Sequence, residues 1–286
     1  MVINQLKTKK GQYGMLLFIV VILFSCSSTK KETVTKENPP GTIWLRDNLY
    51  MDATPICNVY YREYEYSNRN YSKYNFSQLD SVVNSLPYFG FDIKSYLHNS
   101  VFTPNPDSAK YKIDLNKFQS NSSLLSYMEY GIDRRYEFYP IMNMPYLGAI
   151  SFCKWRTAMM MLSYASIKTY SKRAVKHKKI KYRLPTKEEW EYAVTHLPIK
   201  FSFNENISYS GKGIVTQVFN DPIYGVHNYD SKSIFLNDLS EMVSEKNIAK
   251  GRNWNDSTSW KNVNFTTSYQ DASNWLTFRC ICEVED

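Results

Sequence analysis

Two cysteines near the carboxyl end of the sequence are spaced in a way that could do chemistry. Cys280 and Cys282 are two residues apart, so in an extended segment both thiols lie on one face, where they could react or hold a metal ion. Neighbouring cysteines on one face do not readily close a disulfide with each other, and we expect this pair to be structural. In an oxidising compartment a Cys57–Cys280 disulfide is one of the pairings that the sequence leaves open.

Histidines and carboxylates offer few further candidates. The four histidines show neither His-x3-His nor His-Glu-x-x-His spacing, which are patterns typical of metal sites. They are His98, His177, His196 and His227. Asp238 and Glu241 could form an acid–base pair or hold a structural calcium ion. We predict no catalytic residue, no metal site and no cofactor, apart from the calcium ion that this carboxylate pair would suit.

The most strongly specified local structure lies in residues 182–194, Tyr-Arg-Leu-Pro-Thr-Lys-Glu-Glu-Trp-Glu-Tyr-Ala-Val. Thr186 and Glu189 have the spacing of a capping box, in which each side chain bonds the backbone of the other residue. Pro185 keeps the preceding chain extended. The apolar residues that follow Glu189 fall on one side of a helix, so the sequence predicts a helix that packs against a core.

The amino-terminal segment is typical of a bacterial lipoprotein signal. Three lysines precede ten apolar residues at positions 15–24, a run too short for the roughly 20 residues that span a bilayer. Leu-Phe-Ser-Cys at 23–26 resembles a lipobox, which predicts a signal peptide over 1–25 and lipidation of Cys26. Residues 26–41 are polar and predict a flexible tether. An ordinary secretory signal and an uncleaved anchor are the alternatives.

The positive charge of the chain is mild. The formal net charge is +8, and three of the lysines that contribute to it lie in the predicted signal peptide. Residues 172–183 contain seven Lys and Arg residues, a run that could meet phosphate or an acidic partner. No nucleic-acid-binding motif accompanies it, so we interpret it as a solvated connector and predict no nucleic-acid partner.

The predicted helix and several other segments resemble motifs of the formylglycine-generating-enzyme (sulfatase-modifying factor) family. Residues 182–194 are similar to the family's RLPTEAEWEYA segment, and residues 52–64 to its opening strand-to-helix element. The other similar segments are residues 140–155 (family hPVvnVsWedAvaYCeWl), 237–243 (GNVWEWV), 250–254 (RGGSW) and 276–281 (tGFRcv). All of them occur in the family's order.

The resemblance implies an α+β fold related to C-type lectin domains, with short strands and much irregular structure. It implies a single domain over residues 42–286 with an insertion at about 66–135. Structural roles carry over to the residues that match the family's motifs. These residues are Asn58, Trp155, Arg183, Pro185, Glu189, Trp190, Glu241, Gly251, Trp254, Phe278 and Arg279.

The same resemblance argues against catalysis. Catalytic relatives bind copper(I) through two cysteines shortly after the RGGS element, because soft thiolates suit a soft metal. The matching positions lie near Asp256 and Lys261, and no cysteine occurs between Cys153 and Cys280. Relatives that use nonheme iron need a histidine cluster, which this sequence does not show. Glu241 occupies a family position that usually serves as a structural hydrogen-bonding centre.

We therefore expect a non-catalytic outer-membrane lipoprotein, held to the membrane by its lipid and bound to envelope proteins. Degenerate domains of this kind resemble the gliding-motility and type IX secretion lipoproteins of Bacteroidota, where they act as scaffolds. One alternative is a lectin-like module that binds a glycan or peptide through Trp254, Trp260 and Trp275. The other is a divergent metal-dependent oxidoreductase built on Cys280 and Cys282.

Overall fold

A computed structural model of the chain describes residues 38–70, 112–114, 124–166, 177–197, 199–201, 233–235, 239–253 and 265–285. The chain divides into two units, Met1–Pro40 and Gly41–Asp286, and the fold below is that of the second. The predicted signal peptide, Cys26 and almost all of the predicted tether lie outside the described residues. Within the described part of the chain, no helix has both the length and the apolar character needed to cross a membrane.

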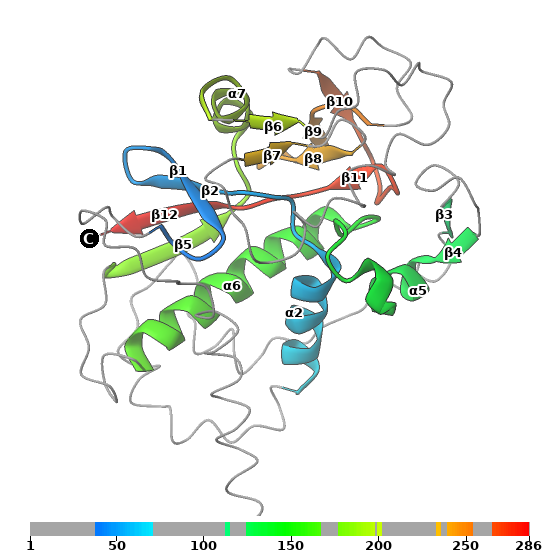
Figure 1. Cartoon of the computed structure of the whole chain (residues 1–286), viewed down its shortest axis with the longest axis horizontal. Coiled ribbons are helices and arrows are strands. Elements are labelled where there is room, and N and C mark those ends of the chain that lie inside the picture. Colours follow the sequence, from blue (N-terminus) through cyan, green and yellow to red (C-terminus); the bar gives the residue numbers. More distant parts are fainter. Residues whose placement is uncertain are drawn as a thin grey trace, which may run out of the picture. The chain divides into compact units, whose positions relative to one another are not determined.

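The first sheet joins the two ends of the domain. Its four strands lie in the order β1-β2-β12-β5, and each neighbouring pair is antiparallel. Their bounds are Thr42–Arg46 for β1, Leu49–Asp52 for β2, Ile281–Glu285 for β12 and Lys179–Arg183 for β5. Figure 1 shows the red β12 between the blue hairpin and β5. The carboxyl-terminal strand is thus a central strand, paired on both sides.

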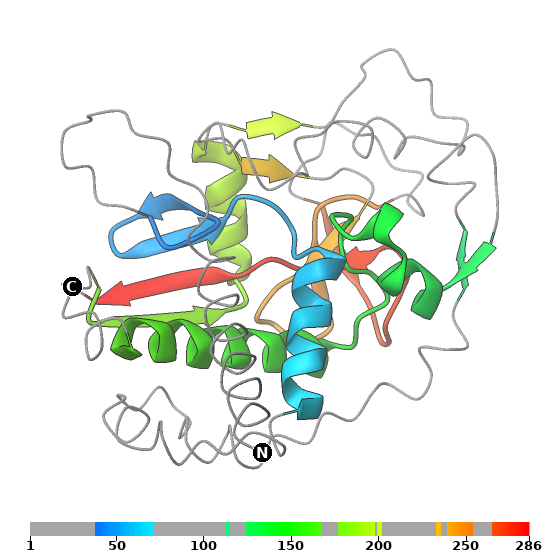
Figure 2. The ribbon, with the colours of Figure 1, turned by 60° about the horizontal axis from the view of Figure 1, so that its bottom comes forward.

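The long helix α6, Tyr146–Ser166, covers the edge strand β5 (Figure 2). Its side chains also bond the strand, because Thr157 Oγ1 accepts from the Tyr182 N–H at 2.9 Å and Met161 Sδ lies 3.3 Å from the Ile180 N–H. Thr157 Oγ1 in turn donates to the Cys153 carbonyl at 2.9 Å. Exposed strand edges can pair with other chains. Here the side chains of α6 accept the hydrogen bonds of these two N–H groups on the edge of β5.

The second sheet is smaller and lies in the carboxyl-terminal part of the chain. Its strands have the order β10-β9-β8-β11, with β11 parallel to β8 and the other pairs antiparallel. Their bounds are Thr266–Ser268, Ile248–Lys250, Ser240–Met242 and Leu276–Thr277, in that order. Two further pairs join β3 (Lys112–Asp114) to β4 (Leu124–Ser126) and β6 (Ile199–Phe201) to β7 (Ser233–Phe235).

The remaining helices are short, and the described residues form an α+β arrangement. They are α2 (Asn58–Asn70), α5 (Tyr127–Ile132), the 3-10 turn η5 (Arg134–Tyr136) and α7 (Lys187–His196). Tyr61 and Tyr64 on α2 are buried, and the centres of their rings lie 5.8 and 5.7 Å from that of Phe152 on α6. Tyr130, within the predicted insertion, is also fully buried and donates to the Pro140 carbonyl at 2.8 Å.

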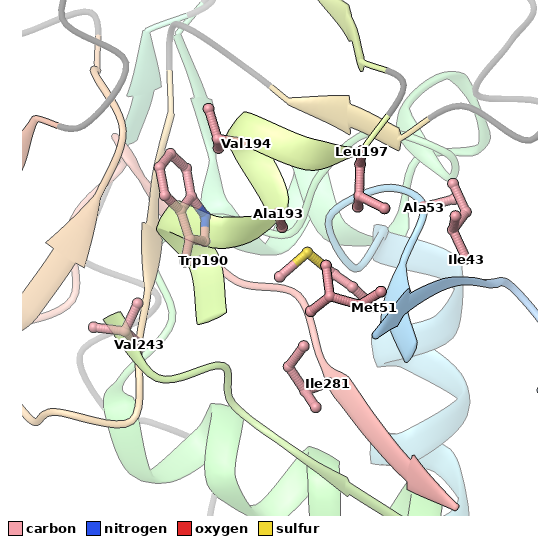
Figure 3. Packing of buried hydrophobic residues seen from close by; sticks show 10 residues of the cluster. Ile43, Met51, Ala53, Trp190, Ala193, Val194, Leu197, Val243 and Ile281 are labelled. Atoms are coloured by element: carbon pink, nitrogen blue, oxygen red, sulfur yellow. The ribbon is translucent and has the colours of Figure 1, made fainter. Parts of the chain in front are cut away.

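The predicted helix cap at Thr186 is confirmed. Its hydroxyl accepts from the Glu189 N–H at 3.1 Å, and the Glu189 carboxylate accepts from the Thr186 N–H at 2.8 Å. Figure 3 shows the apolar cluster on the buried side of α7, to which Trp190, Ala193 and Val194 belong. Residues from both sheets complete this cluster, including Ile43, Leu45, Met51, Ala53, Val243 and Ile281.

The basic run is largely neutralised where the structure describes it. Lys179 and Lys181 on β5 lie opposite Glu285 and Glu283 on β12, with nitrogen–oxygen distances of 3.9 and 4.0 Å. Such exposed cross-strand pairs contribute little to stability but reduce the local field. Lys179, Lys181 and Arg183 thus belong to strand β5 and not to a connector, which corrects the prediction for this half of the run, and Lys172–Lys176 lie outside the described residues.

The cap gives a direct stability test. We expect Thr186→Ala to lower the free energy of unfolding by about 1 kcal/mol, because the Glu189 N–H loses its acceptor. Thr195→Ala, at the exposed end of the same helix, is the matched control; its exposed hydroxyl bonds carbonyls one turn back and the neighbouring His196 ring, so its effect stays below about 0.5 kcal/mol. Urea unfolding followed by circular dichroism compares them, and equal effects would contradict the cap assignment.

Candidate functional site

Glu241 lies at the centre of the polar interior. The side chain is on β8 and only 1% exposed, and its partner Arg279, which follows β11, is fully buried. Arg279 donates from Nε to one carboxylate oxygen and from Nη2 to the other, both at 2.6 Å. Trp190 Nε1, from α7, donates to Oε2 at 3.0 Å. The carboxylate therefore accepts three hydrogen bonds, from two different segments of the chain.

Arg279 also connects this pair to the first sheet. Its Nη1 donates to the Asp52 carbonyl at the end of β2, at 3.1 Å. The Asp52 carboxylate is itself buried and receives Arg156 Nη1 from α6 at 2.8 Å to each oxygen. The Cys280 N–H donates to the same carboxylate at 2.8 Å. A continuous polar network thus links α7, β8, the β11–β12 connection, β2 and α6.

Arg156 is charged although it faces the interior. Burial acts to lower the pKa of its guanidinium, but the charge and hydrogen bonds of Asp52 hold that pKa well above the ordinary value. The guanidinium carbon lies 4.1 Å from the centre of the Tyr182 ring, a cation–π contact. The sequence patterns described above singled out neither Arg156 nor Asp52. A cation among buried apolar positions is a signal for a buried carboxylate partner, and this signal was missed.

Arg183, at the end of β5, has two acidic partners. Its two terminal nitrogens donate to the Glu189 carboxylate at 2.6 and 2.7 Å, and Nε donates to Glu283 at 2.5 Å. Burial acts to raise the pKa of Glu189, but Arg183 and the Thr186 N–H outweigh it and lower that pKa below the ordinary value. Arg183 and Glu189 therefore join β5 to the start of α7.

Gly251 and Lys250 explain why the segment after β9 approaches Trp190 so closely. Gly251 has φ +81°, and a Cβ at this position would lie 3.2 Å from the Trp190 ring, so a side chain would be strained and crowded. Lys250 is fully buried and donates to Glu191 at 2.7 Å and to Thr266 at 2.9 Å. Both residues hold the β9 segment against α7.

The other predicted family residues have structural positions. Asn58, at the start of α2, donates from Nδ2 to the Tyr136 carbonyl at 2.8 Å. Trp155 packs among rings of α2 and α6, and the ring centres of Phe278 and Phe152 lie 5.5 Å apart.

Pro185 also has a structural contact, because its carbonyl accepts from the Ser244 N–H at 2.8 Å. Trp254, the remaining predicted residue of this set, lies outside the described residues, as does the second carboxylate of the calcium pair, Asp238.

The described cysteines are buried thiols. Burial raises the pKa of Cys57 and of Cys282 to about 12 and moves that of Cys280 in the same direction, which disfavours the thiolates that bind metals or react. Among the residues that the structure describes, no group of three or more His, Cys, Asp or Glu side chains could hold a metal ion. His98 and His227 lie outside this set.

The model for the sulfatase-modifying factor enzyme 1-like domain matches residues 20–214 of the chain. The chain therefore belongs to this family, and the family prediction is confirmed. Searches of curated proteins and of solved structures found no match. Glu241 and Arg279 lie beyond the matched range, yet both belong to the network that contains Trp190, which lies inside it. The structure thus joins the matched and unmatched parts of the chain through one buried centre.

Removing the charge of Glu241 tests this centre. We expect Glu241→Gln to lower the free energy of unfolding by about 3–5 kcal/mol, because Arg279 remains buried without a counter-charge. Glu283→Gln is the matched control, since Glu283 also pairs with an arginine but its side chain is 33% exposed; its cost should stay below about 1 kcal/mol. Chemical denaturation measures both, and similar values for the two variants would refute a central role for Glu241.

The lowered pKa of Glu189 predicts an acid-sensitive contribution to stability. The folded pKa lies below the ordinary value of 4.5, so the contribution is complete above pH 4.5 and is lost as the pH falls through the folded value. Glu189→Gln should therefore reduce stability at pH 7 and flatten the loss of stability below pH 4.5. Glu188→Gln, an exposed carboxylate in the same turn, is the control, and a flattening of equal size in that variant would count against the assignment.

Proposed function

We propose that this chain is a non-catalytic member of its family, a lipoprotein held to the outer membrane through Cys26 that serves as a scaffold in an envelope machine. One observation carries the proposal: Glu241 is buried and accepts three hydrogen bonds. A buried carboxylate that is paired with a buried arginine and accepts three hydrogen bonds is poorly suited to take a proton or coordinate an ion. Its role is to join elements of the fold.

The distribution of cysteines supports the same proposal. Copper-dependent relatives need two cysteines in the segment after Gly251, and the chain has no cysteine between Cys153 and Cys280. Cys280 and Cys282, the thiols on which a divergent oxidoreductase would depend, are fully buried. Burial raises the pKa of both thiols, so neither is prepared to act as a nucleophile or a metal ligand.

The finer fold assignment also belongs to this proposal. Short strands in two four-stranded sheets, together with helices such as α6 and α7, are what a formylglycine-generating-enzyme-like, C-type-lectin-related domain would present. Such a fold places much of its surface in loops, which are the regions that vary most readily between relatives and carry binding. A scaffold can use that surface while its buried network remains intact.

The particular machine is proposed by analogy with the family. The lipobox ending in Cys26 and the absence of the copper-binding cysteines are features of the gliding-motility and type IX secretion lipoproteins of Bacteroidota. We propose that the chain binds envelope proteins of such a machine, with the predicted insertion at about 66–135 as a contact surface. The lectin-like alternative would use Trp254, Trp260 and Trp275; Trp275 is half-buried and the other two lie outside the described residues.

Recovery of partners from intact envelopes tests the scaffold role. The tagged chain is cross-linked in its native envelope, purified and analysed by quantitative mass spectrometry beside a Cys26→Ala variant. We expect secretion or motility proteins in stoichiometric amounts with the unchanged chain and their loss with the variant, which should also leave the membrane fraction. Recovery of no such protein, together with specific binding on a glycan array, would overturn the scaffold role in favour of the lectin-like one.

A further inference from the structure

The β1–β2 hairpin holds an aromatic ring at the surface of the domain. Trp44 lies on β1 between Ile43 and Leu45, which are buried in the cluster around α7. Because successive side chains of a strand point to opposite faces, the Trp44 side chain is turned away from this cluster, and it is 53% exposed. The other tryptophans that the structure describes are buried or half-buried.

Hydrogen bonds hold this ring in one place. Trp44 Nε1 donates to the Asp47 carbonyl in the hairpin turn at 3.1 Å. The turn is bound to the central strand β12, because Asn48 Nδ2 donates to the Val284 carbonyl at 3.2 Å and the Asn48 carbonyl accepts from the Val284 N–H at 3.0 Å. An indole whose N–H is already bonded can enter an apolar phase without leaving a donor unpaired.

The ring also lies close to the point where the anchored chain would enter the sheet. β1 begins at Thr42, so the Cα atoms of Thr42 and Trp44 are about 7 Å apart. Whatever its path, the chain from Cys26 to Thr42 spans at most about 55 Å. The other exposed large apolar side chains of the described residues, Tyr66, Ile132 and Leu147, lie further along the chain on α2, α5 and α6.

We propose that Trp44 contacts the interfacial layer of the lipid bilayer that holds the chain, and that the β1–β2 hairpin is the part of the domain that faces the membrane. This inference rests on the proposed lipid anchor at Cys26. Tryptophan is enriched at membrane interfaces, where its apolar ring and its polar N–H are both accommodated. The acyl chains hold the protein at the bilayer, and the ring orients the domain on it.

Charge contributes little to this contact. Arg46 and Asp47, which follow Trp44 in the hairpin, carry opposite charges, and the Arg46 guanidinium carbon lies 4.7 Å from the centre of the Tyr192 ring on α7. A segment without net charge gains little from the negative surface of anionic lipids. The contact therefore depends on the indole ring and should be insensitive to salt.

This orientation leaves the proposed protein-binding surface accessible. Figures 1 and 2 show the β1–β2 hairpin and α5 at opposite ends of the second unit. Ile132 at the end of α5 is 61% exposed, and this helix belongs to the predicted insertion. A bilayer at the hairpin would thus lie on the side of the domain opposite to α5, so lipid and envelope proteins need not compete for one surface.

Quenching of Trp44 by lipid tests the contact. The full chain is exported and acylated in a bacterium, then reconstituted into phosphatidylethanolamine–phosphatidylglycerol vesicles with or without lipids brominated in their acyl chains, which quench tryptophan on contact. Subtracting the spectrum of Trp44→Phe isolates the Trp44 emission. We expect brominated lipid to lower this emission roughly two-fold or more, equally at low and high salt. A Trp44 emission unchanged by brominated lipid would overturn the inference.

Hydrogen exchange gives a second readout, which covers the whole hairpin. We expect the amides of residues 44–48 to exchange several-fold more slowly in the vesicle-bound chain than in the Cys26→Ala chain in solution, since the bilayer excludes water from them. Trp44→Ala should remove this difference. Leu147→Ala, which removes another exposed apolar side chain, is the matched control and should retain it. Equal exchange rates on vesicles and in solution would also overturn the inference.

Vesicle flotation and the mass of the amino-terminal peptide test the anchor separately. If Cys26 is acylated and the chain floats with the vesicles while Trp44 remains unquenched, the lipoprotein proposal stands and this inference fails. A chain that carries no acyl group on Cys26 and does not float would overturn both.

Discussion

The buried ion pair between Glu241 and Arg279 is the interaction on which the described structure depends most. Two charges removed from water are costly, and only close geometry and further hydrogen bonds offset that cost. Here both conditions hold, because the guanidinium binds the carboxylate through two nitrogens and Trp190 adds a third donor. The contact fixes β8, α7 and the connection between β11 and β12 in one arrangement. A misplacement of any of these elements would leave a charge buried without its partner.

Further ion pairs extend this arrangement outward. Asp52 and Arg156 tie α6 to β2, and Arg183 with Glu189 ties β5 to the start of α7. The strand β12 lies between the groups and pairs with β2 and β5 through its backbone. Charged side chains in these positions specify which elements meet, since an apolar contact has no comparable direction or partner preference. The ion pairs therefore determine how the helices and strands are placed relative to one another. Apolar side chains, such as those around α7, pack the space between these elements.

This use of charge bears on function. The carboxylates and thiols that the structure describes at the centre of the domain are paired or buried, so they maintain the fold. Active relatives in this family perform oxidation. A fold that is stabilised by a buried polar network does not need catalytic cysteines to keep its shape. Fold and chemistry are separate properties, so a domain can keep this buried network whether or not it keeps the chemistry of its relatives.

The sequence by itself determined the local structure and the family. Thr186 and Glu189 specify their cap through neighbouring backbone groups, and the order of short motifs identified the family, because both signals depend on residues close together in the chain. Tertiary structure alone decided which distant groups meet. The Asp52–Arg156 pair spans 104 positions and the Cys153–Cys280 contact spans 127, and no local pattern encodes such partners. They follow from the packing of α6 along β5 and from the central place of β12, which exist only once the whole domain has folded.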